Sequence, residues 1–476
     1  MTLPDKMPLD MIENHTFDEI RVGDTACLGR TLKAEDIQLF AAMSGDVNPA
    51  HVDPAYADST PFHGIIAHGM WGAALISTVL GTEYPGPGAI YLGQSLRFLE
   101  PVHIGDTLEV RVTVSAKDAQ NHQVTLDCTC TNQEGVAAIA GSALVRAPTE
   151  KIRRPRLAPL QVRLRDKTLR YRQLLARAEG LAPITMAVVH PCSEDALRGA
   201  IDAAQMGLIV PILVGPETRI RALAAGAGIE LGATRIAAAP HSHAAAALAV
   251  QMARSGEVQA LMKGSLHTDE LMAEVLSASA GLRTDRRVSH VYLLDVPSYP
   301  KPLLISDAAI NIEPDLAAKR DIVQNAIDLA QAIGIAQPRV AILAAVETVN
   351  ANMRSTLDAA ALCKMADRGQ IGGGIVDGPL AFDNAISAQA AKDKGIVSPV
   401  AGQADILIAP DLEAGNMIAK QLQYLADAQA AGLVMGARVP LVLTSRADGP
   451  MARIASCALA LLAVQAKAGA ATPQGS

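Results

Sequence analysis

The sequence predicts two domains of different fold class, an α+β domain followed by a larger α/β domain with a mostly parallel sheet. In the first part, one apolar helical segment precedes several apolar segments separated by turns, which is typical of antiparallel strands packed on a helix. In the second part, short apolar runs alternate with helical segments, as in a parallel sheet. The chain of 476 residues is also longer than a domain with one hydrophobic core usually is.

The composition is that of a globular protein and excludes several classes of partner. Hydrophobic residues make up 50% and charged residues 19%, which argues against general disorder. The net charge is -7 and no basic stripe is interleaved with aromatics, so we expect no nucleic-acid partner. Residues 1–10 lack the apolar run of a signal peptide, and no uncharged apolar stretch reaches the length of a bilayer span. We therefore expect a cytoplasmic protein with no membrane contact.

The cysteines give no reason to expect disulfides or a metal site. Of the six, only Cys128 and Cys130 are close in sequence, and their spacing puts both on one face of a strand. Two buried small side chains explain that spacing better than a metal or redox pair does. No metal ligand set is predicted anywhere in the chain.

The first domain is predicted over residues 1–148. An opening strand is expected over residues 17–28 and a short helix over residues 33–44. A helix apolar on nearly every side should begin at residues 68–70. Strands are then expected over residues 90–98, 107–116, 123–132 and 136–145.

The segment Gly45–Asp53 is the hardest part of this domain to explain as scaffold. It places Asp46, Asn48 and His51 within six positions around a proline, so that the carboxylate and the imidazole can lie on one bend. A carboxylate and an imidazole that converge can hold a water molecule and transfer its proton. The same segment also fits an Asx turn with a capping Asp and a solvated His.

The start of the apolar helix offers a second functional group. Its first backbone N–H groups are free and lie at the positive end of the helix dipole, so they can stabilise an oxyanion. Gly69 would let a ligand approach the backbone closely. We interpret the neighbouring His63 and His68 as structural or helix-capping groups.

Together these segments resemble the MaoC-like (R-specific) enoyl-CoA hydratases of the hot-dog fold. The matching pieces are FAAMSGDVNPAHVD at residues 40–53 and IAHGM at residues 66–70. The resemblance implies that Asp46 and His51 activate water with the support of Asn48. It also implies that the N–H of Gly69 polarises the thioester carbonyl of a trans-2-enoyl-CoA.

An Arg-rich segment with several prolines follows and is predicted to be a linker over residues 149–172. A basic groove for phosphate groups is the alternative interpretation. Beyond it, strands are expected at residues 184–190, 209–214, 288–294, 303–305, 340–343, 374–376, 406–408 and 439–443. Residues 194–206 and 319–333 are predicted helices.

Polar clusters follow these apolar runs, at the strand ends where α/β sheets bind ligands. Each could be an ordinary turn, but the clusters recur in register. They contain Lys263, Asp307, Asn311, Asn416, and Ser445 with Arg446 and Asp448. No phosphate-binding GxxxxGK[ST] or GxGxxG motif is present, so nucleotide hydrolysis and NAD chemistry lack support.

The clusters resemble the phosphate acetyl/butyryltransferase family. Their sequences are more similar to the butyryl type than to the acetyl type. The matching pieces are LMKGSLHT, SDAAINIEPD, AAVETVN, VDGPLAFDNA, PDLEAGN and LTSRAD, spread over residues 261–448. The family fold implies two subdomains within residues 173–476, one of about 173–310 with 445–476 and one of about 311–444.

The resemblance also implies roles for residues in this half. Ser445 and Arg446 would bind phosphate or stabilise the tetrahedral intermediate, and Arg283 is a candidate second anion contact. Where the acetyl-type enzymes carry a general base, this chain has Ala452, so Asp448 is the candidate in its place. Lys263, Asp307, Asn311 and Asn416 are expected to contact substrate.

The sequence thus predicts a fused enzyme with two activities on coenzyme A thioesters. One is hydration of short-chain trans-2-enoyl-CoA, and the other is acyl transfer between CoA and phosphate. CoA thioesters and phosphate are substrates, and no cofactor is expected. Both families usually self-associate, which implies a homo-oligomer. Two alternatives stay open: the second domain could be a non-catalytic acetyl-CoA sensor, and the first a dimerisation module.

Overall fold

The computed structural model describes residues 10–157, 162, 168–443 and 449–471. The chain forms two compact units, Met1–Arg165 and Asp166–Ser476, and each is considered by itself. The boundary between the units falls inside the predicted linker, residues 149–172. That segment also carries strand β7 (Arg153–Pro155), and helix α5 begins at Leu169 within it.

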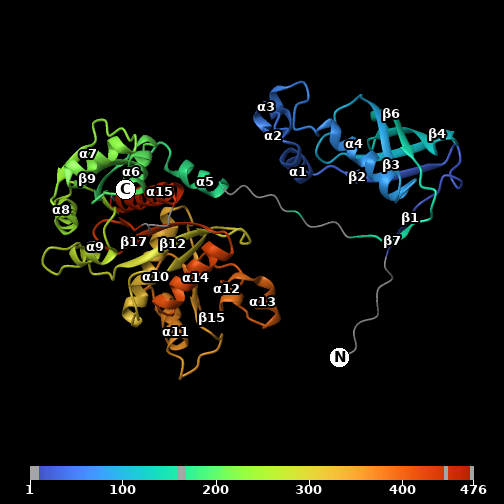
Figure 1. The fold of residues 1–476 in the computed structure, drawn as a ribbon. Helices are drawn as coiled ribbons and strands as arrows, with labels where there is room; N and C mark the ends of the chain where they lie inside the picture. The colour runs from blue at the N-terminus through green and yellow to red at the C-terminus, as the bar shows by residue number, and fades with distance from the viewer. Residues whose placement is uncertain (1–9, 158–161, 163–167, 444–448, 472–476) are drawn as a thin grey trace, which may run out of the picture. The chain divides into compact units, whose positions relative to one another are not determined.

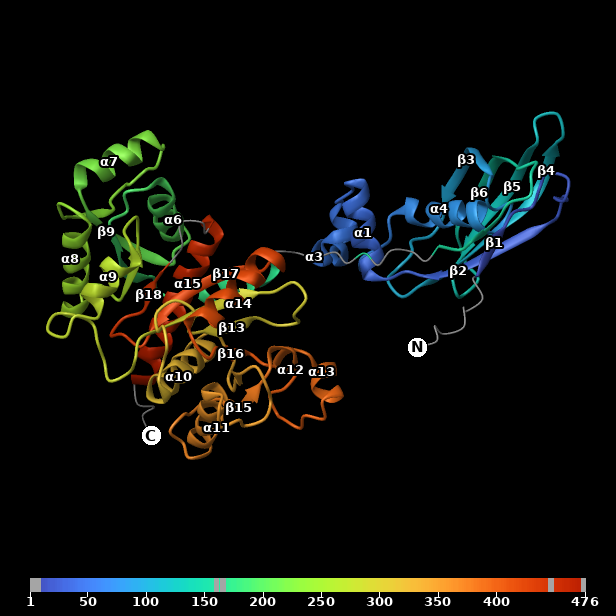
Figure 2. The same cartoon turned by 60° about the horizontal axis from the view of Figure 1, so that its bottom comes forward.

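The N-terminal unit is an antiparallel five-stranded sheet packed on a buried helix (Figure 1). The strands run in the order β2-β4-β5-β6-β3. Their bounds are β2 Thr25–Thr31, β3 Ile90–Phe98, β4 Thr107–Asp118, β5 Gln123–Thr131 and β6 Ala137–Arg146. Helix α4, Gly69–Thr78, packs against β3 and β4, with Trp71 and Ile76 buried (Figure 2). Side chains alternate between buried and exposed along β4, so one face of the sheet forms the core.

Short elements complete this unit. Strand β1 (Met11–Glu13) pairs with β7, and helix α1 spans Ala34–Ser44. Helices α2 (Pro49–Val52) and α3 (Pro54–Ser59) follow, and the π-helix η1 (Val79–Glu83) continues α4. The strand expected over residues 17–28 begins only at Thr25, so the prediction is wrong for the residues before it. Phe17 and Ile20 are buried from turns instead, because Asp24 accepts a hydrogen bond from the backbone N–H of Arg21 and closes a turn.

The C-terminal unit is built on one 11-stranded sheet, ordered β10-β9-β8-β11-β18-β17-β12-β13-β16-β14-β15. The strands up to β18 and those from β13 onward form two parallel groups, which the antiparallel strands β17 and β12 join. The bounds are β8 Ile184–Val189, β9 Ile209–Gly215, β10 Arg235–Ala238, β11 Ala260–Lys263, β12 Ser289–Asp295, β13 Leu303–Ser306, β14 Arg339–Leu343, β15 Ile375–Leu380, β16 Ile406–Ile408, β17 Gln429–Met435 and β18 Leu441–Val442.

Helices lie on both faces of this sheet, as expected for an α/β fold. Their bounds are α5 Leu169–Ala178, α6 Glu194–Gln205, α7 Glu217–Gly226, α8 Ser242–Ser255, α9 Thr268–Val275, α10 Leu316–Ala332, α11 Arg354–Asp367, α12 Phe382–Ile386, α13 Ala388–Asp393, α14 Leu412–Leu425 and α15 Pro450–Ala471. Because the sheet is continuous, the division into two subdomains at residues 310 and 311 stays a prediction.

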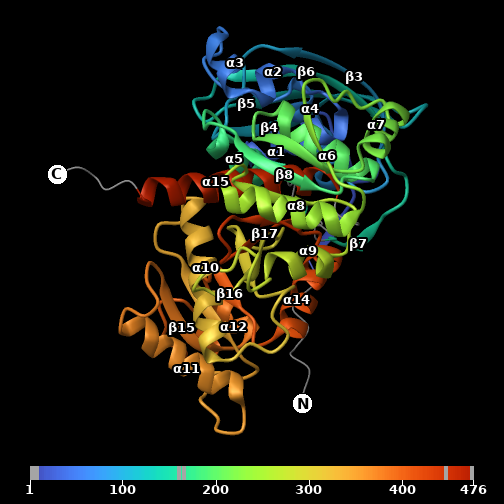
Figure 3. The same cartoon turned by 90° about the vertical axis from the view of Figure 1, so that its left-hand side faces the viewer.

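Helix α15 is long and apolar enough to cross a membrane by length and composition alone. Its middle, however, is a core element, with Cys457, Leu459 and Leu461 fully buried. It packs on β17, α5, α6 and α10 (Figure 3). The apolar character of α15 is therefore explained by its place inside the C-terminal unit.

Candidate functional sites

The predicted Asp46 bend is a chain of small turns at the end of α1. Gly45 ends α1 in the left-handed conformation, with φ of 76°. The Asp46 carboxylate then accepts a hydrogen bond from the backbone N–H of Asn48, at 3.2 Å. The Asn48 side chain in turn accepts from the N–H of Ala50 at 3.1 Å and caps α2. Asn48 therefore holds the bend in shape, while Asp46 remains exposed.

His51 lies on α2 and is oriented by a backbone carbonyl. Its Nδ1 is 2.9 Å from the carbonyl oxygen of Ile66. Since a carbonyl oxygen only accepts, Nδ1 must carry the proton. The neutral ring then keeps the lone pair on Nε2, which can act as a base.

His68 is the N-cap residue of α4, and its ring lies beside that of His51. Its Nε2 is 3.0 Å from the backbone carbonyl of Asp46, and α4 has no side-chain cap from it. The ring centroids of His68 and His51 are 4.0 Å apart, and the His68 side chain is buried. The geometry agrees with the expected structural role of His68, because it is the N-cap residue of α4 and its ring reaches back to the bend. His63 is exposed on the preceding loop.

Asp46, His51 and His68 together bring their donor atoms within 4.8 Å of one another. That spacing could hold a metal ion. Two of the four imidazole nitrogens are nevertheless occupied by backbone carbonyls, and Asp46 is exposed. The absence of a metal stays a prediction for this site.

A cavity of about 330 Å³ opens beside these groups, where α4 begins. Its polar lining residues are His51, His68 and Glu100, and Gly69 lines it as well. Its apolar wall comprises Phe62, Ile66, Trp71, Phe98, Leu99, Val102 and Ile139. Phe98 packs so closely on Gly69 that an added Cβ would lie 3.0 Å from the ring. Glycine at this position keeps the backbone N–H at the start of α4 accessible to a ligand.

In the C-terminal unit, a cavity of about 830 Å³ brings together two of the predicted residues, Lys263 and Asn416. Lys263 ends β11, and Asn416 lies in the first turns of α14 and donates a hydrogen bond to the carbonyl of Ala308. The cavity is also lined by Lys420, one turn after Asn416 on α14. This is the strand-end position that α/β folds use for ligands.

Asp307 and Asn311 serve the loop after β13. The Asp307 carboxylate accepts hydrogen bonds from the backbone N–H groups of His290, Ala309, Ile310 and Asn311. It also accepts from the Asn311 side chain, at 2.5 Å. Asp307 is buried, so its present partners are protein groups. Direct contact of Asp307 or Asn311 with substrate stays a prediction.

Arg283 lies in a different cavity, of about 480 Å³, with Arg286, Arg287 and Asn311. Arg287 is fixed there because its Nε donates to the side-chain oxygen of Asn311 at 2.8 Å. Arg283 is exposed. Arg283 therefore lines a different cavity from the one that Lys263 and Asn416 line.

His290 was not among the predicted residues, although it lines the cavity of Lys263. It is 1% exposed, and burial lowers the pKa of its imidazole to about 4. Its Nδ1 has no hydrogen-bond partner in the described part of the chain. No sequence signal singled it out, since it is the second residue of an apolar strand with no motif around it.

The predicted catalytic residues Ser445, Arg446 and Asp448 lie outside the described residues. Ala452, at the position of the missing acid, is on the first turns of α15. It lines a third cavity that contains neither Lys263 nor Asn416.

The folds and cavities define a two-unit protein with a hot-dog domain and an α/β domain that has a polar strand-end cleft. A family model described as "MaoC like domain" matches residues 23–134, and one described as "Phosphate acetyl/butaryl transferase" matches residues 232–461. The chain belongs to the phosphate acetyl/butyryltransferase family and carries a MaoC-like domain before it. Both resemblances noted in the sequence are thereby confirmed.

Named relatives agree with this membership. A phosphate acetyltransferase of Rhizobium meliloti is 63% identical over 62% of this chain and 93% of its own length. A phosphate butyryltransferase of Clostridium acetobutylicum is 39% identical over 61% of this chain and 97% of its own. A branched-chain phosphotransacylase of Enterococcus faecalis V583 has a solved structure that is 28% identical, with a TM-score of 0.51, over 59% of this chain and 99% of its own. The expected nearness to the butyryl type is therefore wrong.

Proposed function

We propose that the protein is a bifunctional enzyme acting on coenzyme A thioesters. The N-terminal unit hydrates short-chain trans-2-enoyl-CoA to (R)-3-hydroxyacyl-CoA. The C-terminal unit transfers an acyl group between CoA and phosphate, giving acyl phosphate and free CoA. His51 and Gly69 line one cavity and Asp46 lies beside His51, which supports the first activity. The 63% identity to a named phosphate acetyltransferase supports the second.

The hydration mechanism follows from the tautomer of His51. With Nδ1–H donated to Ile66, the Nε2 lone pair can take a proton from a water molecule placed between His51 and Asp46. The water oxygen attacks C3 of the enoyl group, and the proton that His51 accepted is delivered to C2, which restores the neutral ring. Charge that develops on the thioester oxygen is stabilised by the Gly69 N–H at the start of α4.

The size of the cavity supports the short-chain preference. At about 330 Å³ it lies near the lower end of the range of ligand pockets, about 300–1,000 Å³. Trp71 and Ile139 form part of its wall. A crotonyl group fits this proposal better than a long acyl chain does.

The transferase mechanism needs cations near the phosphate and a way to protonate the departing thiolate. Phosphate attacks the thioester carbonyl, the tetrahedral intermediate collapses, and CoA leaves as the thiol after gaining a proton. Lys263 and Lys420 line the cavity that we propose for this reaction, and Asn416 can donate hydrogen bonds there. By family resemblance, Ser445 and Arg446 hold the intermediate, and Asp448 is the candidate group that protonates the departing thiolate and takes the thiol proton as a base in the reverse direction. Acetyl is the first acyl group to test, given the acetyl-type relative.

The two activities can be tested in one protein. Asp46→Ala should lose crotonyl-CoA hydration and keep acetyl phosphate formation, and Arg446→Ala should do the reverse. Each variant is then the folding control for the other. Wild-type protein that makes acetyl phosphate without hydrating crotonyl-CoA would leave the first unit a dimerisation module. Acetyl-CoA binding without acyl phosphate formation would favour the sensor alternative for the second unit.

We also propose that the protein self-associates in the cytoplasm. Strand β3 is at the edge of the N-terminal sheet, and Ile90, Leu92 and Phe98 on it are exposed. An exposed apolar edge strand is suited to pairing with a second copy. Sedimentation of the wild type against Leu92→Lys measures this, and an unchanged monomeric mass in both would exclude it.

A further inference from the structure

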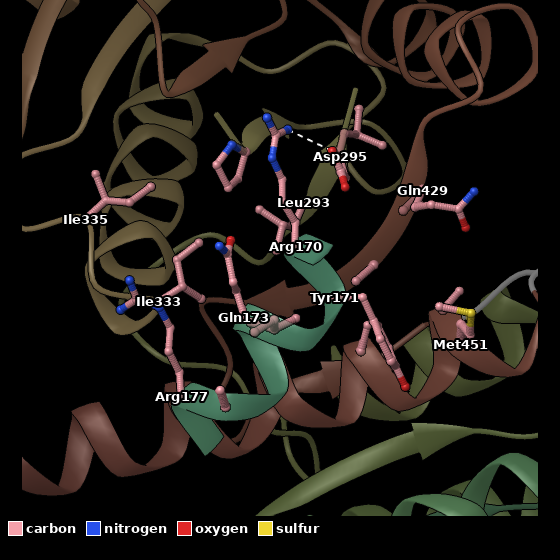
Figure 4. Close-up of a pocket in the computed structure, with 18 residues that line it drawn as sticks. Arg170, Tyr171, Gln173, Arg177, Leu293, Asp295, Ile333, Ile335, Gln429 and Met451 are labelled. Carbon is pink, nitrogen blue, oxygen red and sulfur yellow. Dashed lines mark hydrogen bonds and ion pairs between the residues drawn. The ribbon is translucent and has the colours of Figure 1, made fainter. Parts of the chain in front are cut away.

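The C-terminal unit contains a cavity of about 620 Å³ that is separate from the cavity proposed for acyl transfer. It is enclosed by α5, β12, β17, the end of α10 and the start of α15 (Figure 4). Tyr292 lines the acyl-transfer cavity, whereas the next residue, Leu293, lines this one. Successive residues of a strand point to opposite faces of the sheet. The two cavities therefore lie on opposite faces of β12, and they share no lining residue.

Small side chains on two elements leave this space empty. Ala430 and Ala431 of β17 and Ala452 and Ala455 of α15 line it. Leu293 and Ile333 add larger apolar surface. The alanines line a cavity that is open to solvent, and their small side chains leave room in it for an apolar ligand body.

The polar groups of the cavity fall into two sets. Arg170 is already neutralised, because its guanidinium pairs with Asp295 at 2.7 Å and donates to the carbonyls of Tyr299 and Lys301. Gln173 and Arg177, four residues apart on α5, lie along one side of that helix. Within the described ranges, neither side chain has a hydrogen bond or an ion pair.

Arg177 is held toward the cavity by a close fit to the turn that follows α10. Its guanidinium lies over Gly334, where an added Cβ would be 1.9 Å from Nη1. Gly334 has φ of 90°, in the region that favours glycine. Figure 4 shows the guanidinium beside Ile333, at the edge of the apolar surface. An exposed cation and an exposed amide, neither paired within the described residues, thus lie at the edge of an apolar cavity in which Arg170 and Asp295 neutralise each other.

We propose that this cavity is a binding site for an aliphatic monocarboxylate. The chain of the ligand lies against Leu293, Ile333 and the alanines of β17 and α15. Its carboxylate accepts hydrogen bonds from Arg177 and Gln173, an arrangement that matches a planar guanidinium. Because the site contacts the first turns of α15, its occupancy also stabilises that helix.

The test is calorimetric titration of the full-length protein with octanoate, with octanol as the uncharged probe. We expect saturable octanoate binding at one site in the C-terminal unit and at least tenfold weaker octanol binding, about the value of a charge-assisted contact. Arg177→Gln should weaken octanoate about tenfold and leave octanol unchanged. Ala452→Leu, which fills the chamber from its rim, should weaken both probes.

The matched control is Arg172→Gln, on the same helix but outside the cavity lining, and it should bind octanoate as the wild type does. Circular dichroism and melting of each variant show whether it is folded. Octanoate binding that is absent in the wild type, or equal in Arg177→Gln and the wild type, overturns the proposal. A second combination of results also overturns the proposal: the wild type binds no octanoate, and Ala452→Leu differs from it in sedimentation mass. Those results would mean that a second copy of the chain covers the cavity.

Discussion

The imidazole rings of His51 and His68 lie against each other, tilted by 34° with their centroids 4.0 Å apart, and each ring is fixed by a different backbone carbonyl. His51 is tied to Ile66, while His68 is tied to Asp46, the other half of the proposed catalytic pair. Phe40 closes the far side of His68, with a centroid distance of 4.8 Å. His68 therefore connects the bend to the start of α4 and acts as a positioning residue for His51.

This relationship predicts that His68→Leu lowers kcat for crotonyl-CoA hydration by about tenfold to a hundredfold, because misplacing a catalytic group is costly. The pH profile should also change, since one face of His51 would contact a leucine instead of a ring. His68→Gln can still donate to the Asp46 carbonyl and should recover part of kcat. The exposed His63→Asn is the control and should leave both quantities unchanged. Equal kcat in His68→Leu and the wild type would remove the positioning role.

Gly69→Ala is predicted to raise KM for enoyl-CoA and to have little effect on the free energy of unfolding. The added Cβ would lie 3.0 and 3.1 Å from two carbons of the Phe98 ring, so the ring must move by a few tenths of an ångström into the cavity. The helical backbone of Gly69 tolerates alanine, so the cost should be local.

The matched rescue is the double variant Gly69→Ala with Phe98→Leu, which removes the contacting ring. We expect it to recover most of the lost affinity, measured as KM for crotonyl-CoA. Phe98→Leu alone supplies the baseline. A KM that stays high in the double variant would place the defect at the N–H of residue 69 instead of at the ring.

The sequence allowed the fold of both units to be predicted because their apolar patterns are strong. Strand β3 was predicted with its observed bounds, and α1 within one residue, since periodicity and turn residues agree there. Strand β17 was missed because its QAAGLVM segment is rich in Ala and Gly, which have low strand propensity. It is a strand because β12 and β18 pair with it on its two sides.

The site residues also divide into those that local sequence predicts and those that depend on tertiary structure. That Asp46 and His51 lie close together could be predicted because the motif is short and local in sequence. His290 could not, because its position in the cavity depends on long-range pairing of β12 with β13 and β17. The loop role of Asp307 also depends on tertiary structure, since one of its donors, the N–H of His290, lies 17 residues away.

Asp307→Asn is predicted to destabilise the C-terminal unit by about 2–4 kcal/mol. One of its carboxylate oxygens accepts from both the backbone and the side chain of Asn311, so an amide NH₂ at either end would face N–H donors. Acetyl phosphate formation should fall with the loss of the loop. Urea unfolding followed by the two activities measures this, and hydration in the N-terminal unit is the internal control. Unchanged unfolding would show that the loop has other support.

The stability of the C-terminal unit should depend on pH through His290. Burial lowers the pKa of its imidazole from 6.5 to about 4, so between these values the unfolded chain binds more protons than the folded one. Stability should therefore rise with pH from about 4 to 6.5, and it should fall as acid is added over the same interval. His290→Gln cannot titrate and should flatten this part of the curve. The slope is read from thermal melts of both proteins at matched ionic strength, with His63→Asn as a control that retains the wild-type slope. If His290→Gln kept that slope as well, protonation of another group, such as His190, whose pKa burial also lowers, would be its cause.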